Sequence, residues 1–166
     1  MTTLTLVHVA ISLVAIVFGL VVAFGMVTAK RLDGWTAGFL AMTVATSVTG
    51  FFFPFKGFTP AVNVGIISLV VLGIAIIARY RRHLAGGWRR TYVISAIIAL
   101  YLNVFVLIAQ LFQKVPALKA LAPTQKEPPF VISQVVVMAL FVVLGIKAVK
   151  RFREPVPASV RSIRAA

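Results

Sequence analysis

The chain has 166 residues, of which 61% are apolar and 12% charged, with 17 Lys and Arg against 3 Asp and Glu. A soluble domain is roughly 45–50% apolar and about 25% charged, so this composition excludes a water-facing globule and indicates an integral membrane protein. The chain has no cysteine, which excludes disulfides, thiolate metal sites and cysteine nucleophiles. Its net charge of +14 is typical of nucleic-acid binders, but basic residues between long apolar runs are better explained as membrane loops. We therefore predict no nucleic-acid partner.

Five stretches of the sequence are long and apolar enough to cross a membrane. A helix needs about 20 apolar residues to cross a hydrocarbon core of about 30 Å. In chain order, the predicted spans cover residues 5–28, 35–55, 61–79, 91–113 and 130–148. The short loops between the first four predict antiparallel neighbours in a bundle. The sequence thus predicts an all-α, polytopic membrane bundle forming one domain over residues 1–153, followed by a basic cytoplasmic tail over 154–166 that we expect to be disordered.

Two local patterns predict details of this bundle. On the first span, small residues recur at helical spacing in the stripe His8, Ser12, Ala15, Gly19 and Ala23, which is typical of a face where helix backbones approach closely in lipid. The long loop at 114–129 is rich in proline. Its segment 116–121 begins with proline and is followed by another, which predicts a short helix in the membrane interface.

Basic residues alternate between the two sides of the predicted bundle. One side holds Lys30, Arg31, Arg79, Arg81, Arg82, Arg89, Arg90, Lys147, Lys150, Arg151, Arg153, Arg161 and Arg164, and the other holds only Lys56, Lys114, Lys119 and Lys126. Because cytoplasmic loops collect Lys and Arg, this asymmetry predicts an N-terminus outside and a C-terminus in the cytoplasm. The basic side is expected to face the anionic lipid headgroups of the cytoplasmic leaflet.

Neutral polar residues are the candidate binding groups of the spans. Asn103, Gln110 and Gln113 share one face of the fourth span, and carboxamides in hydrocarbon require hydrogen-bond partners. Polar residues at similar outer depth on the other spans are His8, Ser12, Asn63 and Gln134. One hypothesis is an outward-facing polar pocket, covered by the proline-rich loop with Glu127, for the head of a small amphipathic or lipid-like ligand. The alternative is that these groups only bridge helices, at about 0.6 kcal/mol per hydrogen bond.

The acids and histidines exclude several kinds of chemistry. Asp33, Glu127 and Glu154 all lie outside the predicted spans, so neither a carboxylate-based enzyme nor an intramembrane proton relay can be assembled from them. His8 and His83 are predicted to lie on opposite sides of the membrane, about 30 Å apart, and cannot both ligate one haem. We therefore predict a protein that is not an enzyme, with no metal and no cofactor.

Three segments carry a resemblance to other proteins. They are NVFVLIAQ over 103–110, QKVPALKALAPTQKEPPF over 113–130 and TGFFFPF over 49–55. In these segments the chain resembles a group of small, uncharacterised bacterial multi-pass integral membrane proteins, over roughly residues 45–147. The resemblance implies a bacterial cytoplasmic (inner) membrane, and it implies no activity, cofactor or site because the group has none assigned.

Together, these patterns predict a non-enzymatic inner-membrane protein that acts as a binding or accessory subunit. Its small-residue faces are consistent with homo-oligomers or with a membrane partner subunit. The alternative function is a component of a small-solute or lipid transporter or channel, with Asn103, Gln110, Gln113 and Gln134 lining the route.

Overall fold

A computed structural model of the chain describes residues 3–53 and 60–152, with the side chains of residues 60 and 61 excepted. Within these residues the chain is helical throughout and contains no strand. The elements are α1 (Thr3–Val27), α2 (Asp33–Gly50), α3 (Pro60–Ile76), the π-helical turn η1 (Ile77–Arg81), α4 (Trp88–Lys114), α5 (Pro116–Leu121) and α6 (Pro128–Arg151). The predicted all-α class is confirmed for this part of the chain, whereas the predicted tail over 154–166 lies outside it.

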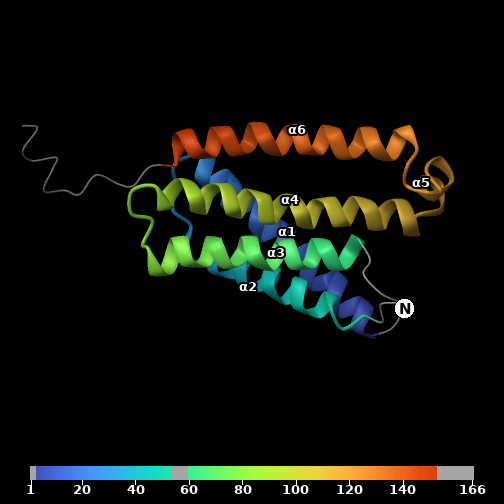
Figure 1. Ribbon diagram of the computed structural model, residues 1–166, viewed down its shortest axis with the longest axis horizontal. Coiled ribbons are helices and arrows are strands. Elements are labelled where there is room, and N and C mark those ends of the chain that lie inside the picture. Colours follow the sequence, from blue (N-terminus) through green and yellow to red (C-terminus); the bar gives the residue numbers. More distant parts are fainter. Residues whose placement is uncertain (1–2, 54–59, 153–166) are drawn as a thin grey trace, which may run out of the picture.

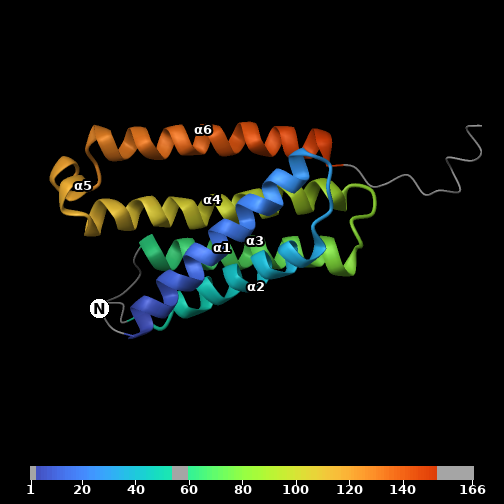
Figure 2. The same ribbon diagram turned by 180° about the vertical axis from the view of Figure 1, so that it is seen from behind.

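The long helices form a bundle in which α4 is central (Figure 1). α4 lies between α3 and α6, and α1 crosses behind it to contact α2, α4 and α6 (Figure 2). The described chain begins at one end of this bundle, beside the start of α3, and α6 finishes at the other end. An odd number of antiparallel passes produces such an arrangement.

Four helical segments are long and apolar enough to cross a membrane: Thr3–Val27, Val62–Arg81, Trp88–Lys114 and Pro128–Arg151. They correspond to four of the five predicted spans. α2, which corresponds to the predicted span over 35–55, has only 18 residues and stops at Gly50. It is less apolar than the others because it begins with Asp33 and carries five hydroxyl side chains, at Thr36, Thr43, Thr46, Ser47 and Thr49.

Small residues set the spacing of α1, α2 and α4. Ala15, Gly19 and Ala23 are buried, which confirms the packing face predicted for the first span. A Cβ atom on Gly19 would lie 2.4 Å from Cδ1 of Leu100 and 2.8 Å from Cε2 of Phe39. The three helices therefore meet at a distance that only glycine allows at this position.

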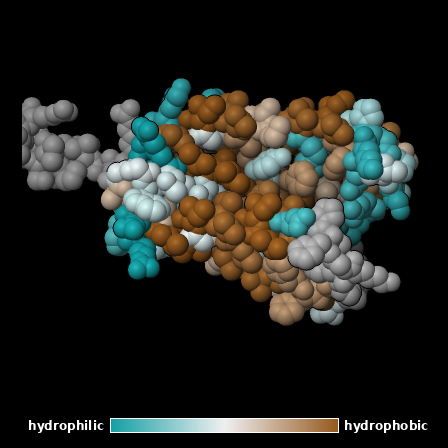
Figure 3. Space-filling view, in the orientation of Figure 1, coloured by the Kyte–Doolittle hydropathy of each residue, from teal (hydrophilic) through white to brown (hydrophobic). Residues whose placement is uncertain are grey.

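The outer face of α6 is apolar and unpacked. Only 6% of its apolar 18-residue stretch is buried, against 39% for α4. Figure 3 shows apolar side chains over the middle of the molecule and hydrophilic ones gathered at its two ends. Such a band is unfavourable in water but is what a hydrocarbon environment requires.

The connection from α4 to α6 is ordered by side-chain hydrogen bonds. α5 matches the short helix predicted over 116–121, with Pro116 in its first turn. After it, the Glu127 carboxylate accepts hydrogen bonds from the backbone N–H and the hydroxyl of Thr124, at 3.1 and 2.9 Å, and from the backbone N–H of Lys126 at 3.0 Å. Desolvation raises the pKa of Glu127, but these hydrogen bonds outweigh it and hold the pKa below the ordinary value of 4.5.

We therefore expect the order of this loop to depend on pH. A carboxylate whose pKa is lowered by folding stabilises the fold above its unfolded-state pKa, and this contribution disappears as the pH falls through the lower, folded-state pKa. Amide hydrogen exchange at Thr124 and Lys126 is predicted to be slow at neutral pH and to accelerate, relative to the intrinsic rate, in acid. Glu127→Gln should weaken the protection at neutral pH and remove its acid dependence. Protection factors in the wild type that do not change with pH would contradict this prediction.

Candidate functional site

The predicted polar residues of α1 contact α2. His8 Nδ1 lies 2.9 Å from the Thr49 hydroxyl oxygen. That hydroxyl has a single hydrogen, which it donates to the Ala45 carbonyl at 2.7 Å, so His8 Nδ1 is the donor of the contact between the two helices. Ser12 donates to the carbonyl of His8 at 2.7 Å, within α1 itself. His8 therefore bridges two helices, whereas Ser12 does not.

The predicted carboxamides form separate contacts rather than one group. Asn103 Nδ2 donates to the Thr43 hydroxyl at 3.3 Å and links α4 to α2. Gln134 Nε2 donates to the Phe105 carbonyl at 3.2 Å and links α6 to α4. Gln113 Nε2 donates to Gln125 Oε1 at 3.2 Å, outside the bundle core, while Gln110 and Asn63 are exposed. These pairings favour the helix-bridging interpretation, and a ligand role for the set stays a prediction.

An apolar groove separates α4 from α6 in the half of the bundle that ends at the α6 C-terminus. Its volume is about 440 Å³, and the lining residues are Ile94, Ile97, Ile98, Tyr101, Met138, Phe141, Val142, Gly145, Ile146, Val149 and Lys150. On α6, the groove runs from Met138 to Lys150, which is about 18 Å at 1.5 Å per residue. This length is close to half of a hydrocarbon core of about 30 Å. The groove is therefore about one membrane leaflet long.

The two ends of the groove differ in chemistry. Toward the middle of the bundle, the rings of Tyr101 and Phe141 approach to 5.7 Å between centroids. At the other end stand two cations: Lys150, which lines the groove, and Arg89, whose Nη1 donates to the Val149 carbonyl at 3.3 Å. The groove thus has aromatic rings near its inner end and positive charge at its other end.

The groove opens at the strongly basic end of the molecule. The connection between α1 and α2, the segment between α3 and α4, and the last turns of α6 all lie there, and Figure 3 shows hydrophilic side chains at this end. The described basic residues of these segments and of the first turn of α4 are Lys30, Arg31, Arg79, Arg81, Arg82, Arg89, Arg90, Lys147, Lys150 and Arg151. Across the bundle, the α4 end, α5 and the following loop carry Lys114, Lys119 and Lys126. The molecule is therefore electrostatically asymmetric along its length.

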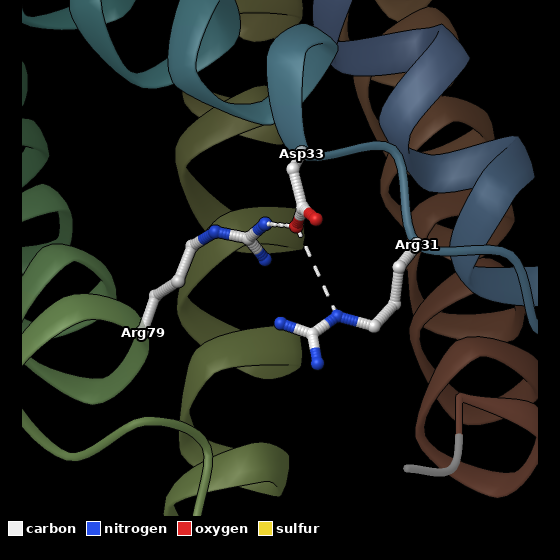
Figure 4. Close-up of polar contacts among 3 residues, drawn as sticks. All are labelled: Arg31, Asp33 and Arg79. Atoms are coloured by element: carbon white, nitrogen blue, oxygen red, sulfur yellow. Dashed lines mark hydrogen bonds and ion pairs between the residues drawn. The ribbon is translucent and has the colours of Figure 1, made fainter. Parts of the chain in front are cut away.

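A polar cluster at the same basic end of the molecule surrounds a buried arginine (Figure 4). Arg79, in η1, forms an ion pair with Asp33 at the start of α2. The Arg79 side chain is 6% exposed and that of Asp33 is 69% exposed, while Arg31 Nε lies 3.8 Å from the same carboxylate oxygen. The Arg79 guanidinium carbon also lies 5.2 Å from the ring centroid of Tyr92, within range of a cation–π contact.

Beside this cluster is a space of about 10 Å³, lined by Lys30, Thr36, Arg79 and Tyr92 together with apolar side chains. Tyr92 is fully buried, and its hydroxyl has no hydrogen-bond partner among the residues that the structure describes. The size and polar lining match what one ordered water requires. The cluster therefore joins α2, η1 and α4 through polar groups at the basic end of the bundle, and the space beside it is too small for an organic ligand.

Sequence reasoning missed both of these features. Arg79 and Asp33 entered the prediction only as loop charges, because their pairing across 46 residues is a tertiary contact. The groove had a weak signal, since α6 is apolar on every face and carries Gly145, whose lack of a side chain leaves room beside Ile97. No protein-family model, curated protein or solved structure matches the chain.

Proposed function

We propose that this protein is a non-enzymatic integral membrane protein that binds an amphipathic, lipid-like molecule in the groove between α4 and α6. The observation that carries the proposal is the groove itself, which combines apolar walls with a cationic opening. Within a bilayer, a lipid tail in the groove gains stability from packing against the apolar walls and from the interactions of its head, and not from removal of apolar surface from water.

We also propose that all five long helices cross a bacterial inner membrane, with the N-terminus outside and the basic end in the cytoplasm. α2 is short, but a hydroxyl side chain in a lipid-embedded helix can bond to a carbonyl one turn back, as Thr49 does to Ala45. Five passes agree with the opposite positions of the first described residues and the α6 C-terminus (Figure 1). The basic end then follows the charge distribution of cytoplasmic loops, and the groove opens to the cytoplasmic leaflet.

The alternative prediction, a component of a transporter or channel, requires polar side chains to line a common route. Asn103, Gln113 and Gln134 instead hydrogen bond to different partners on α2, the loop after α5, and α4. This supports a binding or accessory role over transport.

Filling the groove tests the proposal. A Cβ atom on Gly145 would lie 3.6 Å from Cγ2 of Ile97, an ordinary contact, so Gly145→Leu should fold and place its side chain in the groove. Val143, on the same helix, is 51% exposed and does not line the groove, which makes Val143→Leu the matched control. We expect lipid retained by the protein in mild detergent, quantified by mass spectrometry, to fall at least about threefold in Gly145→Leu.

The control variant should retain lipid as the wild type does. Equal retention by all three proteins would overturn the proposal. Circular dichroism melts of both variants would establish that any loss of lipid does not come from unfolding.

A further inference from the structure

We propose that the groove between α4 and α6 selects lipids with an anionic, phosphate-bearing headgroup, and that Arg89 and Lys150 bind this headgroup. The inference rests on the proposed function and adds the chemistry of the ligand head and the residues that recognise it.

The two cations stand where a headgroup would lie. Lys150 lines the end of the groove, and Arg89 is held against Val149, the neighbouring lining residue, by the hydrogen bond to its carbonyl. A tail extending along the groove from this end toward Met138 would cover about 18 Å, so its head would lie between α4 and α6 beside both side chains. The two cations therefore mark the end of the groove at which a charged head is favoured.

Arg89 is prepared for an anion with several oxygens. A guanidinium has five N–H donors in a planar fork, and the hydrogen bond to Val149 fixes its orientation while occupying one donor. The half-buried position of Arg89 reduces the side-chain entropy lost on binding. The remaining donors match two oxygens of a phosphate, and the Lys150 ammonium adds a point charge.

Among the residues that the structure describes, no carboxylate neutralises these two cations. In residues 3–53 and 60–152, the ion pairs involve Asp33 with Arg31 and with Arg79. Glu127 directly precedes α6, and this helix begins at the opposite end of the bundle, beside α5. No described carboxylate forms an ion pair with Arg89 or Lys150. Placing a second copy of this chain over the groove would bring two strongly basic ends together, whereas an anionic lipid would neutralise one of them. Charge complementarity thus favours the lipid.

Native mass spectrometry of the full chain in detergent, supplied with equal amounts of phosphatidylglycerol and phosphatidylcholine of identical acyl chains, tests the inference. The wild type should retain the anionic lipid at least about tenfold over the zwitterionic one, a factor that corresponds to about 1.4 kcal/mol. In the double variant Arg89→Gln, Lys150→Gln the ratio should approach one while some lipid is still retained. Glutamine removes both positive charges while keeping a polar side chain with neutral N–H donors.

Lys147→Gln is the matched control, because Lys147 is exposed on the same helix and does not line the groove. It should keep the wild-type preference. The inference is overturned if the wild type shows no preference, if the double variant retains it, or if Lys147→Gln loses it equally, which would indicate bulk surface charge. Retention of neither lipid by the wild type would instead refute the proposed function on which the inference depends.

Discussion

Asp33→Asn is expected to destabilise the protein more than Arg79→Met, although Arg79 is the buried partner of this ion pair. The Arg79 side chain is 6% exposed, so its desolvation is offset by the Asp33 carboxylate. Removing that carboxylate leaves a buried charge uncompensated, which typically costs about 3–5 kcal/mol. Because the Asp33 side chain is 69% exposed and water can replace it in part, we expect about 2–3 kcal/mol here.

Arg79→Met removes the buried charge and leaves Asp33 in water, where it needs no partner. Methionine fills much of the same volume and packs well against aromatic rings such as Tyr92, so the cost should be below about 1 kcal/mol. Denaturant unfolding of the variants in matched detergent micelles would measure both. A larger loss of stability in Arg79→Met than in Asp33→Asn would contradict this prediction. It would indicate that Arg79 stabilises the fold mainly through the contacts of its guanidinium with the tyrosine rings.

Gly19→Ala should destabilise the bundle by about 2–3 kcal/mol through overpacking. The added methyl group would lie 2.4 Å from Leu100 Cδ1 and 2.8 Å from the Phe39 ring. Those side chains are themselves 0% and 1% exposed, so neither can move aside without disturbing its own neighbours. The helices α1, α2 and α4 would have to separate at this point.

Gly73→Ala provides the control for this substitution. A Cβ atom on Gly73, in α3, would meet nothing within 4 Å, and replacing glycine by alanine inside a helix is favourable by about 0.5–1 kcal/mol. The same chemical change should therefore leave stability unchanged or raise it at Gly73 and lower it at Gly19. Thermal melts followed by circular dichroism would compare them, and similar shifts at both positions would exclude close packing at Gly19.

The bundle was largely predictable because membrane helices follow from the length of apolar runs. The packing face with Gly19 and the short helix after Pro116 were also predictable, since both depend on local spacing and on residues with restricted or unusual geometry. The end of α2 was less predictable. The predicted span continued to residue 55, whereas the helix ends at Gly50. Residues 54–59 lie outside the described chain.

The candidate site was less predictable, because it depends on how the helices pack against each other and not on the residue pattern of each helix. A face of carboxamides on the fourth span predicts polar contacts but not their partners, and Asn103 and Gln134 reach opposite neighbours of α4. The groove forms where α4 and α6, connected through α5, leave space between apolar side chains. The same types of apolar residue face such a space and face lipid, so the sequence alone does not distinguish the two environments.

Photo-crosslinking most directly tests whether a lipid occupies the groove between α4 and α6. Val142, which lines the groove, and Val17, on α1, are both 55% exposed. Non-specific contact with the surrounding lipid should therefore label the two residues equally. With a phospholipid that carries a diazirine in its acyl chain, peptide mass spectrometry should find several-fold more label at Val142 than at Val17. Equal labelling of the two valines would contradict the proposal that this protein binds a lipid-like molecule there.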